Sequence, residues 1–235
     1  MDTVAVRPLS GRCSEIYTRR EHVLIGVSAL NGYFSQQVVT GLLRWAVRTF
    51  GKVGVLVPGP AELAGTLVAK GCEPGRAPAK ARAAAGNTRN RVGRALAVLG
   101  VAPGEVPVLS WGDLAGDAAY LALRARVESL YTSDAGFREH CVCAVGAVVG
   151  EAGLERWRRE AALPFLFAEL PLVVDSPSIL GVGSSLFCYP RVMPLVDQLY
   201  SGVLPISPAP EQGFLVTHLT SHLTHRNHNR QGGGR

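Results

Sequence analysis

The sequence predicts an α/β fold with a parallel sheet flanked by helices, and two consecutive strand–helix units carry that prediction. The apolar run from Val23 to Val27 is too short for a helix, and apolar residues at helical spacing follow it between Val38 and Phe50. A second short run, Val53 to Val57, ends at Pro58-Gly59-Pro60, and another helical segment begins at about Ala61. Strands that alternate with helices in this way pair in parallel.

The rest of the chain continues the alternation less regularly. Residues 70–94 are rich in alanine, which favours a helix, although Gly86 weakens it. Pro107 has no N–H to donate and makes a strand from Val106 to Leu109 less central in the sheet. Three further helices are expected to begin after Asp117, after Asp134 and at about Leu154, the last of them kinked at Pro164 and ending at Glu169. Strands are expected at Leu170 to Val174 and Leu186 to Tyr189, and a short helix from Val192 to Tyr200.

The composition predicts one domain. The 235 residues, 47% of them hydrophobic, can bury a large core. Residues 1–20 mix proline, glycine and arginine without periodicity, which predicts a loose leader. Residues 216–235 are rich in polar residues and glycine, which predicts a disordered tail. We therefore expect a single domain over residues 21–215.

Positive charge is concentrated in one segment. Between residues 70 and 94, seven lysines and arginines face a single acid, and this local charge of +6 equals the net charge of the whole chain. Such an imbalance suits a polyanionic partner, although a solvated helix face is the simpler explanation for a basic segment seen alone.

Other features indicate a cytoplasmic protein without a membrane segment. No uncharged run reaches the roughly 18 apolar residues that a membrane-spanning helix needs. The first twenty residues contain arginines and no secretory apolar region. The five cysteines are odd in number and have no metal-binding or redox spacing, so we expect reduced thiols and no bound metal.

Ser28 is the candidate nucleophile. It follows the apolar run Val23 to Val27, close to the predicted start of a helix, and ligands of open α/β sheets bind beyond the carboxyl ends of the strands. A serine hydrolase would need glycine at position 30, where Leu30 stands, and a histidine base that the sequence does not obviously supply. Phosphate-binding loops are also missing, and Gly181 to Ser185 lacks the third glycine of a dinucleotide fingerprint. We therefore expect a substrate that arrives already activated, and no cofactor.

Three separated segments together resemble the cyclodipeptide synthases, which use aminoacyl-tRNAs to make cyclic dipeptides. They are His22 to Gln36 (HVLIGVSALNGYFSQ), Phe165 to Pro177 (FLFAELPLVVDSP) and Ser184 to Pro190 (SSLFCYP). The resemblance implies a Rossmann-like catalytic domain over residues 21–215, similar to the catalytic domain of class I aminoacyl-tRNA synthetases. It also implies a monomer that needs no other protein partner.

The resemblance also assigns roles to four residues. Ser28 would accept the aminoacyl group of the first of two aminoacyl-tRNAs used in sequence. The second would supply the amine that attacks this ester, and the dipeptidyl enzyme would then cyclise. Glu169 matches the glutamate that holds the substrate ammonium and moves protons; Tyr189 matches the tyrosine beside the nucleophile, and Asn31 an asparagine of the substrate turn.

Two departures from the family pattern stand out. Phe165, one helical turn before Glu169, replaces a tyrosine found in many members, so the anchoring hydroxyl for the substrate amine is missing. Asn31 is typical of one branch of the family and Pro190 of the other, which leaves the branch undetermined.

The resemblance further implies a side-chain pocket and a tRNA contact. The pocket residues are apolar or small and predict a hydrophobic first amino acid: Leu24, Gly26, Leu56, Trp111, Phe165, Leu172 and Phe187. The expected tRNA contacts lie in the basic segment: Lys80, Arg82, Arg89, Arg91 and Arg94. Two alternatives remain, a serine hydrolase of small esters and a basic RNA-binding module without catalysis.

Overall fold

A computed structural model describes residues 3–150 and 155–220 and confirms the α/β prediction. Its sheet has six strands in the order β1-β6-β5-β2-β3-β4. All neighbouring strands are parallel except β1 and β6, which are antiparallel. The strands are β1 (Thr3–Pro8), β2 (His22–Gly26), β3 (Lys52–Val57), β4 (Val108–Ser110), β5 (Ser185–Tyr189) and β6 (Gln212–Thr220).

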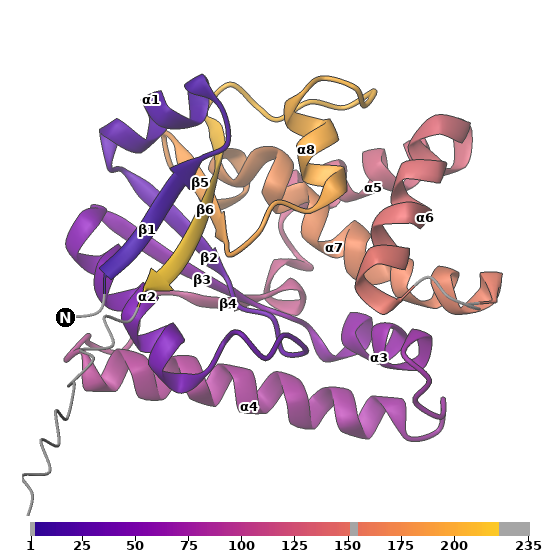
Figure 1. Ribbon diagram of the computed structural model, residues 1–235, viewed down its shortest axis with the longest axis horizontal. Helices are drawn as coiled ribbons and strands as arrows, with labels where there is room; N and C mark the ends of the chain where they lie inside the picture. Colours follow the sequence, from indigo (N-terminus) through magenta and orange to yellow (C-terminus); the bar gives the residue numbers. More distant parts are fainter. Residues whose placement is uncertain (1–2, 151–154, 221–235) are drawn as a thin grey trace, which may run out of the picture.

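Helices cover the sheet on both sides (Figure 1). They are α1 (Gly11–Arg19), α2 (Gln36–Thr49), α3 (Pro60–Ala69), α4 (Ala77–Val98), α5 (Ala118–Ser133), α6 (Ala135–Val149), α7 (Arg156–Leu180) and α8 (Pro194–Tyr200), with a single 3₁₀ turn at Trp111–Leu114. The long helix α4 runs along the lower edge of the view and packs against α2 and α3, whereas α7 packs against α3, α5 and α6.

The order of the strands determines where a ligand can bind. From β2 the chain moves to β3 and β4 on one side of the sheet, and it later returns to β5 and β6 on the other side. The direction of winding therefore reverses between β2 and β5. In open α/β sheets this reversal leaves a crevice at the carboxyl ends of the two strands. All residues of β2 and β5 are buried, so these strands form a rigid floor for that crevice.

The predicted loose leader is wrong. Residues 3–19 form β1 and α1, and β1 pairs with β6 over its whole length, from Thr3 opposite Thr220 to Pro8 opposite Leu215. The residues of β1 alternate between exposed and half-buried, because successive side chains of a strand point to opposite faces of the sheet. This weak apolar pattern hid the strand from sequence analysis.

The predicted tail boundary is also wrong. Strand β6 continues through residue 220, and Gln212 to Thr217 are buried in it. Residues 221–235, the remainder of the predicted tail, lie outside the described residues.

The strand predicted at Leu170 to Val174 is part of helix α7 instead. This helix is interrupted at Asp175, whose backbone is non-helical (φ −156°, ψ 66°) and whose carboxylate caps the next turn by accepting from the Ser178 N–H at 3.2 Å. The Ser176 N–H at the same break donates to Gln212 Oε1 at 2.7 Å. A short apolar run looks the same in a buried strand and in a helix buried on all sides, which explains the error.

Helix α7 is also long and apolar enough to cross a membrane, and it is the one such helix among the described residues. Of its most apolar stretch, 56% is buried inside the protein. The core helix of a globular protein has the same properties.

The predicted caps and two of the later strands are confirmed. Asp117 accepts a hydrogen bond from the Tyr120 N–H, and Asp134 accepts one from the Phe137 N–H, both at 2.7 Å. The strand predicted at Val106 to Leu109 is shorter than expected and forms the edge strand β4, and the strand predicted at Leu186 to Tyr189 is β5.

Candidate active site

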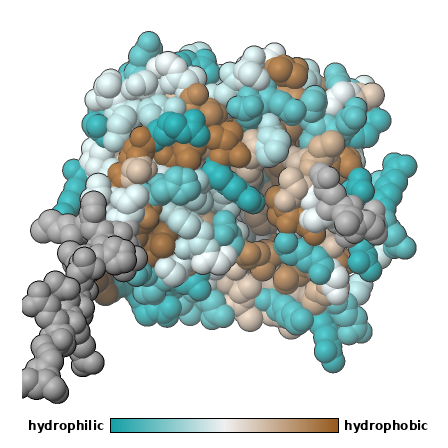
Figure 2. All heavy atoms as spheres, viewed as in Figure 1, coloured by the Kyte–Doolittle hydropathy of each residue, from teal (hydrophilic) through white to brown (hydrophobic). Residues whose placement is uncertain are grey.

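A cavity of about 330 Å³ opens at the carboxyl ends of β2 and β5, with residues of α3, α6 and α7 in its walls. Its volume is in the range of sites that bind small molecules. Ser28, Asn31, Glu169 and Tyr189 all line it. Figure 2 shows apolar side chains, in brown, grouped among hydrophilic ones on the face that Figure 1 presents. Candidate residues that are far apart in the sequence thus meet in one mainly apolar cavity.

Ser28 lies in a loop that continues β2. The Val27 N–H donates to the Leu56 carbonyl at 2.9 Å, which keeps the chain on the sheet up to the residue before Ser28. Ser28 Oγ accepts a hydrogen bond from the Leu30 N–H at 3.4 Å and is half-buried. The helix expected close after Ser28 begins only at Gln36, capped by Ser35. Ser28 is therefore held by a loop rather than by the first turn of a helix.

Tyr189 lies at the end of β5, where the sheet brings it beside Ser28. Burial raises the pKa of its hydroxyl, and the nearby Glu169 charge raises it further, whereas the side chains of Asn31 and Ser28 favour the ionised form. Asn31 Oδ1 accepts a hydrogen bond from the Tyr33 N–H at 3.0 Å, so its amide nitrogen is the group left to meet Tyr189. The hydroxyl of Tyr189 therefore remains a proton donor near neutral pH, within reach of the serine.

Glu169 comes from α7 and is half-buried at the cavity. Burial raises its pKa from 4.5 to about 7. It forms no ion pair with any residue in the described ranges. A carboxyl group that titrates near neutrality is suited to proton transfer, and its ionised form is a natural partner for a bound cation.

Phe165 lies one helical turn before Glu169 and also lines the cavity. Its ring packs edge-on against Trp111, with centroids 4.6 Å apart and planes at 80°. This aromatic pair closes one wall of the cavity with apolar surface, in place of the hydroxyl that a tyrosine would supply.

Gly26 makes room for the aromatic rings beneath the cavity. A Cβ atom at this position would lie 3.1 Å from the Phe187 ring and 3.4 Å from the Tyr189 ring. A side chain at this position would push on both rings, so the close packing of Tyr189 and Phe187 against β2 depends on Gly26.

Four of the seven predicted pocket residues line the cavity: Gly26, Leu56, Trp111 and Phe165. The structure places the other three, Leu24, Leu172 and Phe187, fully buried in the core and outside the residues that line the cavity. Leu24 and Phe187 are partners in the pairing of β2 with β5, two residues before the ends of the strands. The residues at the strand ends lie between these two side chains and the cavity. Leu24 and Phe187 therefore support the floor of the cavity from beneath.

Other cavity residues were not predicted from the sequence. Ala144, Val145 and Val148 come from α6, and they have only apolar side chains as a signal. Lys70 and Arg191 are charged residues of the lining. Arg191 follows Tyr189 by two residues, and this spacing was the one signal that sequence analysis could have used.

The predicted tRNA-binding residues all lie on α4 but differ in their contacts. Lys80 and Arg82 are exposed and form no ion pair with another residue described in the structure. Arg89 pairs with Asp113 at 3.0 Å and donates to the Val108 carbonyl at 2.9 Å. Arg89 thus braces β4 and the 3₁₀ turn that carries the cavity residue Trp111.

Arg91 and Arg94 are connected to the start of α2 through Gln36. Arg94 Nε donates to Gln36 Oε1 at 3.2 Å, and Gln36 Nε2 donates to the Arg91 carbonyl at 3.1 Å. These bonds join α4 to the end of the loop that carries Ser28.

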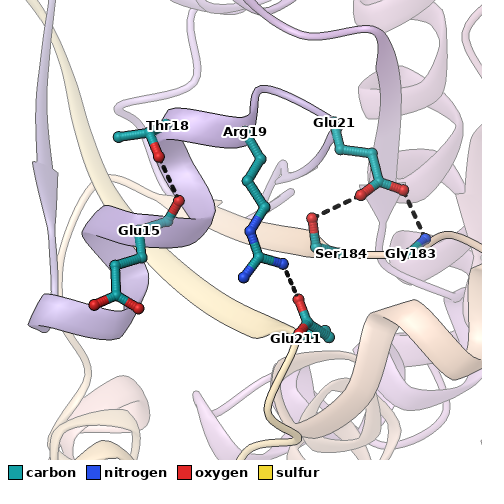
Figure 3. Close-up of polar contacts among 7 residues, drawn as sticks. All are labelled: Glu15, Thr18, Arg19, Glu21, Gly183, Ser184 and Glu211. Atoms are coloured by element: carbon teal, nitrogen blue, oxygen red, sulfur yellow. Dashed lines mark hydrogen bonds and ion pairs between the residues drawn. The ribbon is translucent and has the colours of Figure 1, made fainter.

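A separate group of polar contacts lies at the opposite end of the sheet, near the amino ends of β2 and β5 (Figure 3). The Glu21 carboxylate accepts hydrogen bonds from the Gly183 N–H at 2.6 Å and from Ser184 Oγ at 2.8 Å, and Arg19 pairs with Glu211. The bond from Ser184 is the main cause that lowers the pKa of Glu21. These contacts hold the starts of the strands together and lie outside the cavity.

Comparison with known proteins gives the family. The family model described as cyclodipeptide synthase matches residues 4–218. The chain belongs to the cyclodipeptide synthase family. It is therefore an aminoacyltransferase, and the resemblance seen in three segments is confirmed over most of the chain.

Two curated relatives have specific names. The chain is 33% identical over 217 residues to the cyclo(L-leucyl-L-leucyl) synthase of Bacillus subtilis, covering 88% of this chain and 86% of the relative. It is 32% identical over 213 residues to the cyclo(L-leucyl-L-phenylalanyl) synthase of Streptomyces noursei, covering 88% and 89%.

Solved structures agree with this assignment. A cyclodipeptide synthetase of Mycobacterium tuberculosis, described as related to type I tRNA synthetases, superposes with a TM-score of 0.85 at 28% identity over 92% of this chain and 94% of that one. The tyrosyl-tRNA synthetase of Archaeoglobus fulgidus, at 12% identity and a TM-score of 0.50, covers 86% of this chain and 56% of its own length. This second likeness concerns the fold alone and matches the expected similarity to class I synthetases.

Proposed function

We propose that this chain joins the aminoacyl groups of two aminoacyl-tRNAs into a cyclic dipeptide, with Ser28 as the covalent nucleophile. The supporting observation is the meeting of Ser28, Tyr189 and Glu169 in one cavity at the reversal point of the sheet. The relatives named as cyclodipeptide synthases support the same product class.

In the first step Ser28 Oγ attacks the ester carbonyl of the first aminoacyl-tRNA. The bond to the ribose oxygen breaks, the serine proton passes to that oxygen, and free tRNA leaves. One ester replaces another, so the step needs placement and modest proton transfer rather than a strong base. We assign the proton relay to Tyr189, whose hydroxyl interacts with the Ser28 side chain.

In the second step the amine of the enzyme-bound aminoacyl group attacks the ester carbonyl of the second aminoacyl-tRNA. This forms a dipeptidyl ester on Ser28 and releases the second tRNA. The expectation from the sequence is the reverse attack, of the second aminoacyl-tRNA's amine on the seryl ester. That attack would release Ser28 and leave the dipeptide on the tRNA, so it cannot form a dipeptidyl enzyme. In the last step the free amine of the dipeptide attacks its own seryl ester, closes the ring and returns a proton to Ser28 Oγ.

Both amines must lose a proton before they attack, and we assign this role to Glu169. Its carboxylate first holds the substrate ammonium and then accepts the proton, because a pKa of about 7 lies close to the working range of an amine beside it. The apolar surroundings that raise this pKa also strengthen the attraction between the carboxylate and the ammonium.

The first amino acid is proposed to be hydrophobic. Leu56, Trp111 and Phe165 supply apolar surface to the cavity. A charged side chain would lose its hydration against these three residues, none of which offers a partner for its charge. Turnover of a purified aminoacyl-tRNA that carries a charged amino acid at the first position would contradict this assignment.

Helix α4 is proposed to bind the tRNA backbone through Lys80 and Arg82, with Arg89, Arg91 and Arg94 as further contacts of the same helix. Phosphate contacts release counterions, so the affinity for tRNA should fall steeply as salt is added. From the family resemblance we also propose a monomer that works in the cytoplasm with no cofactor and no protein partner.

The test is incubation of the purified protein with charged tRNAs, followed by mass spectrometry of the products and of the intact protein. The wild type should form a cyclic dipeptide and a trapped aminoacyl ester, and Ser28→Ala should form neither. Ser133→Ala, a serine exposed on α5, is the matched control and should retain both. Release of free amino acid without dipeptide would favour the hydrolase, tRNA binding without either product would favour the inactive module, and full activity of Ser28→Ala would refute the covalent mechanism.

A further inference from the structure

Arg191 is a charged residue of the cavity lining that neither the sequence motifs nor the proposed chemistry uses. It follows Tyr189 and Pro190 directly at the end of β5. Pro190 is buried, so the turn that carries Arg191 is anchored to the core, while Arg191 itself is exposed. The guanidinium is thus held at the solvent side of the cavity rather than in its interior.

The charged groups of the lining differ in how they are engaged. Glu169 is the acidic one, and Lys70 donates to the Val148 carbonyl of α6 at 2.7 Å. Arg191 forms no ion pair with a carboxylate among residues 3–150 and 155–220. Its charge nevertheless acts on the cavity: burial raises the pKa of Tyr189 and Arg191 opposes that rise.

The proposed reaction brings a phosphate to this position. When an aminoacyl ester lies at Ser28, the ribose that carries it must lie at the mouth of the cavity. The phosphate that joins this last nucleotide to the one before it is then only one ribose away from the reacting carbonyl. Strands β2 and β5 are parallel neighbours, so Ser28, which follows β2, and Arg191, which follows β5, lie at the same edge of the sheet.

We propose that Arg191 is a positioning residue that binds the last internucleotide phosphate of the aminoacyl-tRNA and so places the ester against Ser28. This inference rests on the proposed function. A guanidinium presents paired N–H groups that match two phosphate oxygens, so it fixes orientation as well as charge. The α4 residues form a separate contact in this proposal, since none of them is among the residues that line the cavity.

The test combines a protein variant with a substrate variant. Aminoacyl-tRNA is prepared with its last internucleotide phosphate replaced by an uncharged methylphosphonate, and kcat/KM for acylation of Ser28 is measured for the wild type and Arg191→Gln with both substrates. Each change alone should reduce kcat/KM by about 10- to 100-fold, the usual value of a hydrogen bond to a charged group. Together they should cause little further loss, because both remove the same contact.

Two control variants sharpen the result. Arg82→Gln on α4 should weaken the reaction of both substrates by the same factor, so that its effect multiplies with the methylphosphonate effect. Arg191→Lys should recover part of the loss, because it keeps the charge without the paired geometry.

Losses that multiply for Arg191→Gln, or a normal rate for this variant or for the modified tRNA, would overturn the assignment. Formation of cyclic dipeptide by the wild type with unmodified tRNA tests the proposed function separately. A failure of the Arg191 assignment therefore leaves the proposed function standing.

Discussion

Replacement of Glu169 by glutamine should stabilise the protein above neutral pH. Burial raises the pKa of this carboxyl from 4.5 to about 7. Between these two pH values the unfolded chain releases the proton of Glu169 while the folded chain keeps it, so the contribution of Glu169 to wild-type stability falls as pH rises from 4.5 to 7. At 1.36 kcal/mol for each pKa unit, the loss is about 3 kcal/mol.

Glutamine has nearly the same shape and no proton to release, so Glu169→Gln should not show this loss. The variant and the wild type should have similar free energies of unfolding near pH 4.5, and the variant should be more stable by about 3 kcal/mol at pH 7.5. Urea unfolding, followed by tryptophan fluorescence at several pH values, measures the difference. Glu139→Gln, which changes an exposed carboxylate on α6, is the matched control and should follow the wild type.

A stability difference that does not change with pH, or a wild type more stable than the variant at pH 7.5, would refute the buried ionisation. The expected result would show that the protein keeps a destabilising group at its active site. Such a cost is typical of functional residues, and a bound ammonium would offset it.

Three further predictions follow from the geometry. Gly26→Ala should lower the free energy of unfolding by about 1–3 kcal/mol and reduce dipeptide formation, because its Cβ would press on the buried Phe187 ring. Dipeptide formation at the wild-type rate would show that the rings can move. Burial lowers the pKa of His22 from 6.5 to about 4, so in a Glu169→Gln background this residue should cost about 3 kcal/mol of stability as pH falls from 6.5 to 4. Adding His22→Gln should remove most of that loss in urea unfolding, and an unchanged slope would contradict the burial of a neutral imidazole. Arg82→Gln should reduce the slope of log affinity for tRNA against log salt by about 1 in filter-binding titrations, and an unchanged slope would place Arg82 away from phosphates.

The sequence predicts best those elements whose signal is local. Strands β2 and β3 are short apolar runs between breakers, and Asp117 and Asp134 mark helix starts through their own hydrogen bonds. Strand β1 depends on β6, which lies about 200 residues later in the chain, and no local pattern records such a pairing. Helix α7 is buried on several sides, so its apolar run does not show the helical period.

The same reasoning explains which site residues were found. Ser28, Glu169 and Tyr189 follow a recognisable order along the chain, and the fold brings them into one cavity. The alternation along β2 places Leu24 on the same side of the strand as Gly26 but does not give its depth, and the structure buries it beneath the cavity. The cavity wall formed by α6 depends on how α6 packs against α7. The small apolar side chains of α6 give no sign of that packing in the sequence.

The contacts of α4 determine how its role in tRNA binding can be measured. Arg89 holds Asp113 and the Val108 carbonyl, and Arg94 holds Gln36 at the end of the Ser28 loop. Removing either arginine therefore changes the wall or the loop of the cavity as well as the charge of the helix. A loss of activity in those variants would not separate tRNA binding from damage to the site. Lys80 and Arg82 are exposed without such contacts in the described part of the chain, so the electrostatic contribution of α4 has to be read from them.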